Sequence, residues 1–222
     1  MQQDSLQLYS YWRSSAAYRV RIGLHLKQLE FATEAVHLLK DGGQQHAPDY
    51  AALNPQHLLP TLRHGQRTLR QSLAILEYLD EVWPSQPLLP VTAAGRARVR
   101  ALAQLVACDV HPLNNLRVLQ FFEHEWNVPQ AERDEWVRHW IVQGLGAFEA
   151  SLRDDPATGR FCHGDAPGLA DACLVPQLYN ARRFGVDVGQ WPTVSAIDQA
   201  CLALPAFRAA APEAQPDAPS PR

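Results

Sequence analysis

Residues 6–27 read LQLYSYWRSSAAYRVRIGLHLK, and this stretch decides how the first part of the chain folds. The alternation of apolar and polar side chains at its start predicts a strand over Leu6–Ser10. From Tyr18 onward apolar side chains recur with helical spacing, which predicts an amphipathic helix. The opposite face of that helix carries a polar stripe made of Arg21, His25 and Gln28. Ser14 and Ser15 stand where the helix begins, and serine is a preferred N-cap because its hydroxyl accepts a hydrogen bond from a first-turn amide.

The serine pair admits two interpretations. One is a plain helix cap. The other starts from the free N–H groups and the positive dipole end of a helix start, which together stabilise an anion held there. If that anion were a thiolate, its pKa would fall below the value of about 8.5 for a free thiol. No cysteine of the chain stands near Ser14, so the sulfur would have to come from a bound cofactor.

The segments up to residue 82 predict the rest of a small α/β domain. Residues 31–37 fit a second strand, parallel to the first in a right-handed βαβ unit. Pro60 begins an apolar strand, and because proline has no backbone N–H to donate within a sheet, it indicates an edge strand or a special turn. Residues 62–69 fit a hairpin. Ser72 then stands at the start of another helix, for which we expect it to be the N-cap.

Beyond residue 90 the pattern is wholly helical. Three prolines punctuate residues 83–91, which predicts a linker between two domains. Pro112 inside a helical region predicts a kink or break. A later helix carries its apolar stripe at Val137, Ile141, Leu145, Phe148 and Leu152. We therefore expect one domain over 1–87, a second, all-helical domain over 88–211, and a proline-rich tail over 212–222 that is disordered.

Composition narrows the classes of function. A chain of 222 residues with 46% hydrophobic content can bury a sizeable core, and a net charge of −3 gives no reason to expect nucleic acid or a membrane as partner. The arginines at 96, 98 and 100 fit a solvated helix face. The four cysteines include no C-x-x-C pair, and His124-Glu125 does not complete H-E-x-x-H, so we expect no metal site. Neither a signal peptide nor a membrane span is expected, which favours the reducing cytoplasm.

The pattern S-Y-W-R-S-S-x-x-Y-R-V-R-I-x-L-x-L-K resembles the N-terminal signature of zeta-class glutathione transferases. Two later segments extend the resemblance: residues 164–171 are similar to the family's G-D-x-x-T-x-A-D, and residues 180–184 to its N-A-x-R-F. The resemblance implies an α/β, thioredoxin-like N-terminal domain followed by an all-α C-terminal domain. Ala16 departs from the family, because eukaryotic members usually have cysteine there, and any side chemistry of that thiol is lost.

The resemblance also implies the site. Ser14, helped by Ser15, would hydrogen-bond the sulfur of glutathione, and Arg13 and Arg183 would bind substrate carboxylates, for which a planar guanidinium is well suited. The alternative for each arginine is a pair with a surface acid. The remaining residues that would bind glutathione are Gln45, Leu59, Pro60, Gln71, Ser72, His111 and Asn115.

The implied activity is a glutathione-dependent cis–trans isomerisation of a small diketo acid, converting maleylacetoacetate to fumarylacetoacetate by reversible thiolate addition. Maleylpyruvate is the alternative substrate, although Asn115-Leu116 lacks an arginine associated with that branch and Arg117 comes one residue later. A transferase or dehalogenase acting on α-halo acids would use the same residues. A non-catalytic binding module is less consistent with the presence of Ser14, Gln71 and Ser72. The family also implies a homodimer.

Overall fold

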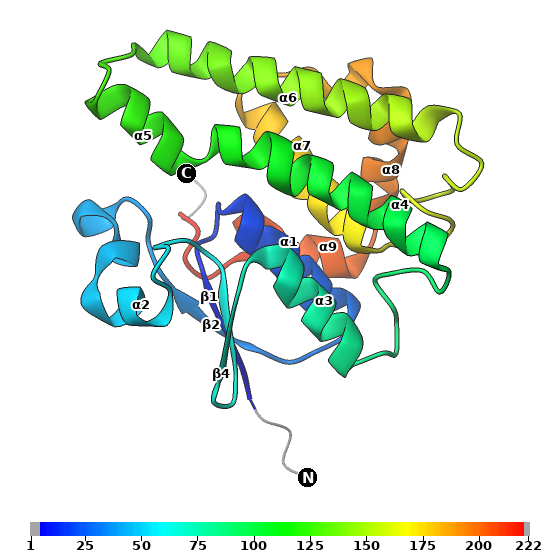
Figure 1. Ribbon diagram of the computed structural model, residues 1–222, viewed down its shortest axis with the longest axis horizontal. Helices are drawn as coiled ribbons and strands as arrows, with labels where there is room; N and C mark the ends of the chain where they lie inside the picture. Colours follow the sequence, from blue (N-terminus) through cyan, green and yellow to red (C-terminus); the bar gives the residue numbers. More distant parts are fainter. Residues whose placement is uncertain (1–4, 220–222) are drawn as a thin grey trace. The chain divides into compact units, whose positions relative to one another are not determined.

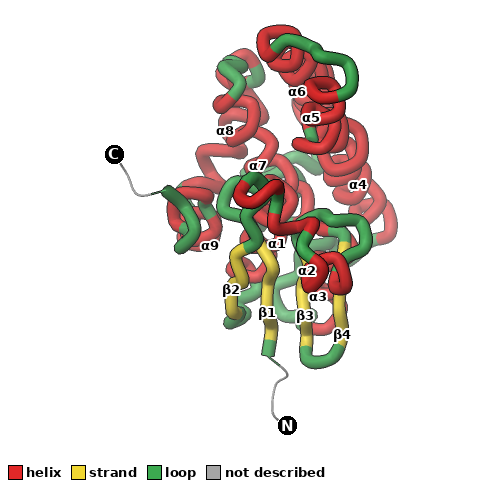
Figure 2. Tube along the Cα trace, turned by 90° about the vertical axis from the view of Figure 1, so that its left-hand side faces the viewer, coloured by secondary structure: helices red, strands yellow, loops and turns green. Residues whose placement is uncertain are grey.

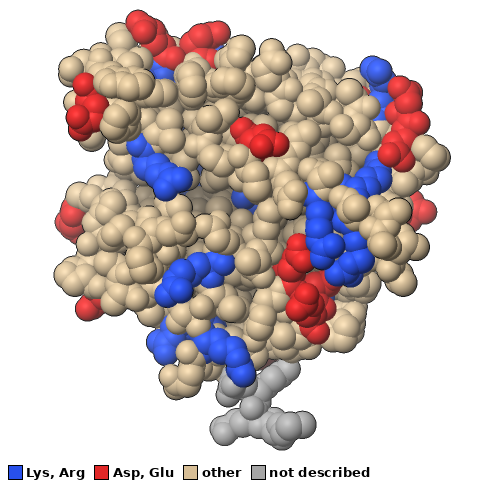
Figure 3. Space-filling view, in the orientation of Figure 1, with Lys and Arg blue, Asp and Glu red and all other residues tan. Residues whose placement is uncertain are grey.

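A computed structural model describes residues 5–219, which form two compact units. One unit comprises the chain up to Leu88 together with the segment from Ala203 onward, and the other comprises Leu89–Leu202. Within the described range no helix has the length and apolar character needed to cross a membrane. Figure 3 shows acidic and basic side chains in small groups, some of them adjoining, on the face that it presents.

The first unit is built on a mixed four-stranded sheet of order β2-β1-β3-β4. Its strands are β1 (Leu6–Ser10), β2 (Ala32–Ala35), β3 (Thr61–His64) and β4 (Arg67–Arg70). β1 pairs with β2 in parallel and with β3 antiparallel, and β3 and β4 form an antiparallel hairpin. The predicted strand over Leu6–Ser10, the parallel second strand and the hairpin are all confirmed.

The helices of this unit are α1 (Ser15–Leu26), α2 (Pro48–Leu53), α3 (Ser72–Val82) and α9 (Pro205–Ala210). α1 lies against both α3 and α9 (Figure 1). Gly23 permits the close approach of α1 and α3, because a Cβ atom there would come 2.1 Å from Cδ2 of Leu76. Short 3-10 helices at Lys40–Gly42, Gln44–His46 and Pro212–Ala214 complete the unit.

The C-terminal part of the chain corrects the predicted domain division. We expected residues up to 211 in the helical domain and a disordered tail after them, but the chain from Ala203 onward joins the first unit. Phe207 and Ala210 of α9 are fully buried. Proline-rich composition predicted disorder, whereas a few apolar contacts and specific hydrogen bonds order this segment through residue 219. Residues 220–222 lie outside the described range.

The second unit is wholly helical, as predicted. It contains α4 (Ala93–Gln104), α5 (Leu116–His124), α6 (Gln130–Arg153), α7 (Leu169–Arg183) and α8 (Pro192–Leu202), with short turns at Leu105–Val110, His111–Asn114 and Val188–Gln190. The chain changes from α-helix to π- and 3-10 geometry around Pro112, which confirms the predicted break. All five side chains of the predicted apolar stripe on α6 are fully buried.

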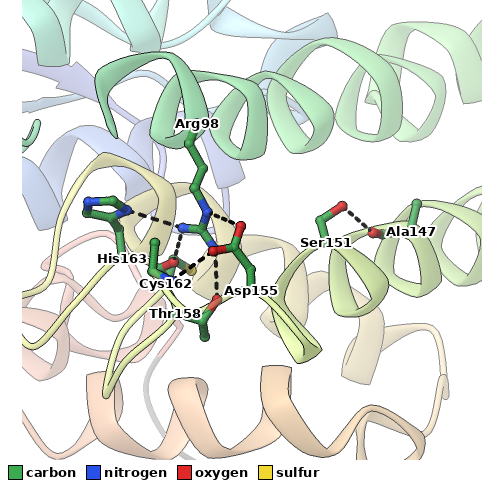
Figure 4. Close-up of polar contacts among 8 residues, drawn as sticks. Arg98, Ala147, Ser151, Asp155, Thr158, Cys162 and His163 are labelled. Carbon is green, nitrogen blue, oxygen red and sulfur yellow. Dashed lines mark hydrogen bonds and ion pairs between the residues drawn. The ribbon is translucent and has the colours of Figure 1, made fainter. Parts of the chain in front are cut away.

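One arginine of α4 corrects the expectation of a solvated face. Figure 4 shows Arg98 pointing into the loop between α6 and α7. Its guanidinium donates to Oδ2 of Asp155 at 2.8 Å, to the carbonyl of Cys162 at 2.6 Å and to Oγ1 of Thr158 at 2.7 Å. The fork of donors in one guanidinium therefore holds three points of the loop between α6 and α7 together.

Candidate active site

Four connections leave the sheet of the first unit at the same end. The strand register places Tyr9, Thr61 and Arg70 in one row across β1, β3 and β4, and it places Ser10 beside Ala35 of β2. The segments after β1, β2 and β4, and the segment before β3, therefore lie together, opposite the hairpin turn (Figure 2). These segments carry Arg13, Ser14, Ser15, Gln45, Leu59, Pro60, Gln71 and Ser72.

Ser14 is the N-cap of α1, as predicted. Its Oγ atom accepts a hydrogen bond from the amide of Ala17 at 3.2 Å. Because the hydroxyl oxygen acts there as acceptor, its own O–H remains able to donate to a ligand. Within residues 5–219 the amides of Ser15 and Ala16 have no intrachain acceptor, as is usual in a first helical turn. One hydroxyl, two amides and the helix dipole can thus stabilise an anion here.

Arg13 lies directly before this helix start. Its guanidinium carbon lies 5.5 Å from the centre of the Trp12 ring, in cation–π contact. Among the described residues no carboxylate forms an ion pair with Arg13. The alternative of a surface ion pair therefore finds no support, and the charge is available to a ligand.

The Leu59–Pro60 peptide bond is cis, so a special turn leads into β3, which is one of the two alternatives that Pro60 indicated. In the described part of the chain neither backbone polar group of Leu59 has an intrachain partner, so an extended ligand can pair with them as an added strand. The preceding carbonyl, of Leu58, accepts from Oη of Tyr50 at 2.6 Å and from Nδ2 of Asn54 at 2.7 Å. Burial raises the pKa of Tyr50, which keeps this phenol protonated as a donor. Tyr50 and Asn54 hold the turn in place, and neither was identified from sequence.

Gln45 has a buried side chain with unused hydrogen-bonding capacity. Only 6% of the residue is exposed, its Nε2 atom makes one long contact of 3.5 Å to the carbonyl of Leu38, and Oε1 has no partner among the described residues. Its backbone carbonyl lies 3.0 Å from Nδ1 of His57, which anchors the loop. Since a buried amide oxygen without a partner is costly, a ligand donor at this position would be stabilising.

The start of α3 corrects one detail. The N-cap is Gln71, with a φ angle of 69°, and Ser72 is the first helical residue. Positive φ is rare for a residue with a side chain and is concentrated at ligand sites. Nη1 of Arg19 donates to Oγ of Ser72 at 3.3 Å, and because a guanidinium only donates, the Ser72 hydroxyl keeps its proton for a ligand. Nε2 of Gln71 donates to Oε1 of Gln56 at 2.8 Å.

Three of the predicted site residues lie in the second unit. His111 begins the 3-10 helix that contains Pro112. Asn115 is the N-cap of α5, its Oδ1 atom accepting from the amide of Arg117 at 3.2 Å, which gives it a structural role that sequence did not indicate. Arg183 lies at the end of α7, with its guanidinium carbon 4.8 Å from the ring centre of Phe184.

Arg21 corrects the predicted polar stripe of α1, because it is fully buried. Its guanidinium donates to the carbonyl of Ala210 at 2.9 Å, to Oγ of Ser10 at 3.0 Å and to the carbonyl of Trp12 at 2.9 Å. Burial lowers the pKa of Arg21 to about 10, so the side chain still carries its charge at neutral pH. The spacing of Arg21 predicts a surface position, but acceptors from segments outside α1 make its burial favourable.

The comparisons with known proteins agree with this geometry. Residues 13–82 match the family described as glutathione S-transferase, N-terminal domain. The chain is 50% identical to a probable maleylacetoacetate isomerase of Vibrio cholerae, over 96% of this chain and 99% of the relative. It is similar to the holo structure of a bacterial zeta-class maleylpyruvate isomerase, with a TM-score of 0.93, 47% identity, and coverage of 96% and 100% of the two chains. A maleylacetoacetate isomerase of Anaeromyxobacter dehalogenans, with glutathione bound in its active site, superposes with a TM-score of 0.88 at 49% identity, covering 99% and 100%.

Proposed function

The chain belongs to the zeta-class glutathione transferases that comprise the maleylacetoacetate and maleylpyruvate isomerases, and from this premise we propose that it isomerises maleylacetoacetate to fumarylacetoacetate. It is a glutathione-dependent cis–trans isomerase. The observation that carries the proposal is Ser14 at the start of α1, where a free O–H and two free amides coincide.

Glutathione fits the donors and acceptors of the first unit. It is an extended tripeptide with a carboxylate at each end and a thiol between them. The unpaired backbone groups of Leu59, beside Pro60, suit its peptide bonds. Ser72 and Gln71 at the start of α3 suit the γ-glutamyl carboxylate. The Oε1 atom of Gln45 is an acceptor and suits the N–H of the glycyl residue. When bound, glutathione supplies a thiolate that adds reversibly to a carbon–carbon double bond and so permits rotation.

The residues of this chain then have three tasks. Ser14 donates its O–H toward the sulfur, and the amides of Ser15 and Ala16 add to the positive end of α1, which keeps the thiol ionised. Arg13 binds a carboxylate of the substrate, since its guanidinium carries no internal ion pair in the described range. Arg183 remains a candidate for the same task on the strength of the resemblance, as do His111 and Asn115 for contacts to glutathione.

The substrate assignment rests on the segment around Asn115. Leu116 follows it, so the chain lacks an arginine at the position that the resemblance associates with the maleylpyruvate branch. Arg117 is displaced from that position by one residue. This arrangement favours the longer acetoacetyl substrate.

The test is a comparison of kcat/KM for maleylacetoacetate and maleylpyruvate, each with and without glutathione, and of halide release from an α-halo carboxylic acid. We expect activity with maleylacetoacetate to depend on glutathione and to exceed that with maleylpyruvate by about tenfold or more. Isomerisation that persists without glutathione would overturn the assigned role of the tripeptide. A higher kcat/KM for maleylpyruvate, or for halide release from the halo acid, than for maleylacetoacetate would overturn the substrate assignment.

We further propose that the protein is a cytoplasmic homodimer. The homodimer follows from the resemblance and from the prevalence of two-fold symmetry. The cytoplasm is supported by the cysteines, because none of those in the described residues forms a disulfide: Cys108, Cys162, Cys173 and Cys201. Light scattering coupled to size-exclusion chromatography measures the oligomeric state directly.

A further inference from the structure

The peptide groups of Trp12 are held by two charged side chains from different parts of the chain. Its N–H donates to Oδ2 of Asp217 at 2.8 Å, and its carbonyl accepts from Nη2 of Arg21 at 2.9 Å. Hydrogen bonds with an ionised partner are stronger than neutral ones. Trp12 directly precedes the Arg13-Ser14 pair, so the backbone that leads into the site is fixed on both sides.

Arg21 connects this backbone to the C-terminal segment. Its Nε atom donates to the carbonyl of Ala210 in α9, and Nη1 lies 3.4 Å from the carbonyl of Tyr11. The same Tyr11 carbonyl accepts from the amide of Ser14 at 2.9 Å. One buried guanidinium therefore contacts α9 and the turn that ends at Ser14.

Residues 205–217 form an ordered element, which we call the C-terminal clasp. α9 buries Phe207 and Ala210. After it, Nε2 of Gln215 donates to the carbonyl of Ala209 at 3.0 Å and to that of Ala211 at 2.9 Å. This local bonding places Asp217 beside Trp12, although the two residues are 205 positions apart.

We propose that the C-terminal clasp and Arg21 of α1 together position residues 11–14, the loop that follows β1, with Asp217 and Arg21 as the positioning residues. Neither residue touches the reacting atoms. By fixing the peptide groups on both sides of Trp12 they hold the ring that Arg13 contacts, and they hold the turn that places the Ser14 hydroxyl. Donors that are held before the ligand arrives stabilise a charge better than donors that must reorganise. The inference rests on the proposed function of Ser14.

Asp217 is the residue to change, because it is only partly buried and lies near the end of the chain. Asp217→Ala removes the acceptor for the Trp12 amide, whereas Asp217→Asn keeps an acceptor oxygen. Asp154→Ala is the matched control, since that carboxylate is 83% exposed and belongs to the other unit.

Two measurements do not depend on turnover. Amide hydrogen exchange of a peptide covering residues 11–18 is measured in the protein without glutathione, and the thiol pKa of bound glutathione is titrated by thiolate absorbance. In Asp217→Ala, loss of one charge-assisted hydrogen bond should speed the local exchange about tenfold and raise the pKa of the bound thiol. As a third readout, kcat should fall about five- to tenfold, with a smaller change in KM. In Asp217→Asn the exchange rate, the thiol pKa and kcat should return most of the way to their wild-type values. Asp154→Ala should match the wild type.

Each other outcome overturns the inference. If Asp217→Ala leaves both the exchange and the thiol pKa unchanged, the clasp does not position the loop. If it lowers the melting temperature but not the thiol acidity, the role is merely structural. Failure of Asp217→Asn to rescue would show that the bond to Trp12 is not the connection. Failure of the proposed function would give a different result. In that case the thiol pKa of glutathione bound to the wild-type protein would equal the pKa in buffer.

Discussion

Ser14 performs two tasks that substitution can separate. Its oxygen accepts from the amide of Ala17 as the N-cap of α1, and its O–H is the proposed donor to the sulfur. Ser14→Ala removes both functions. Ser14→Asp removes only the second, because aspartate is among the best N-caps but its ionised carboxylate donates nothing.

The magnitudes of the two effects differ enough to be told apart. Loss of the cap in Ser14→Ala should lower the free energy of unfolding by about 1 kcal/mol, which is roughly 2–4 °C in Tm for a chain of this size. Loss of the donor should lower kcat by about 10- to 1000-fold, comparable with removal of one oxyanion donor. Ser14→Asp should keep the stability of the wild type and lose at least as much activity, because a carboxylate beside the sulfur raises the thiol pKa.

The assay pairs urea unfolding of the protein without glutathione with kcat for maleylacetoacetate and a titration of the bound thiol. Ser151→Ala is the control, since that hydroxyl donates to the carbonyl of Ala147 on an exposed part of α6, as Figure 4 shows. It should leave all three quantities near those of the wild type. If Ser14→Ala isomerised at the wild-type rate, or if Ser14→Asp remained active, the assignment of Ser14 as the thiol donor would be refuted.

Three further predictions concern hydrogen-bond partners that only the structure shows. Arg19→Met should raise the Kd for glutathione about five- to tenfold in calorimetry, because it frees the Ser72 hydroxyl to rotate away, and Arg19→Lys should lose less. The pKa of Asp155 is lowered chiefly by the hydrogen bond from Arg98, so its stabilisation is complete above about pH 4 and is lost as the pH falls through the lowered value. Tm measured from pH 2 to pH 5 should therefore decline less steeply in Asp155→Asn than in the wild type. Asp171→Ala should lower the free energy of unfolding by about 3 kcal/mol in urea, since it leaves the backbone amides of Cys162 and Gly168 without an acceptor, and Asp171→Asn should cost less.

Patterns confined to a few neighbouring residues predicted much of the fold. The strand Leu6–Ser10, the cap at Ser14 and the apolar stripe of α6 follow from alternation, helical periodicity and hydrogen bonds between near neighbours. The break at Pro112 follows from the missing amide of proline. The site was predicted from the motifs of a resembling family, and the strand register explains why the motifs of the first unit meet at one end of the sheet.

What sequence by itself could not decide was the choice of distant partners. Arg21 has helical spacing on a polar stripe, and only the folded chain shows that acceptors from Trp12 and Ala210 make its burial favourable. The proline-rich end of the chain has a composition typical of disorder, yet Asp217 accepts a hydrogen bond from the amide of Trp12 in the loop after β1. Local propensity depends on a few adjacent side chains and can be read in order, whereas burial of a charge depends on which groups the whole fold brings within hydrogen-bonding distance.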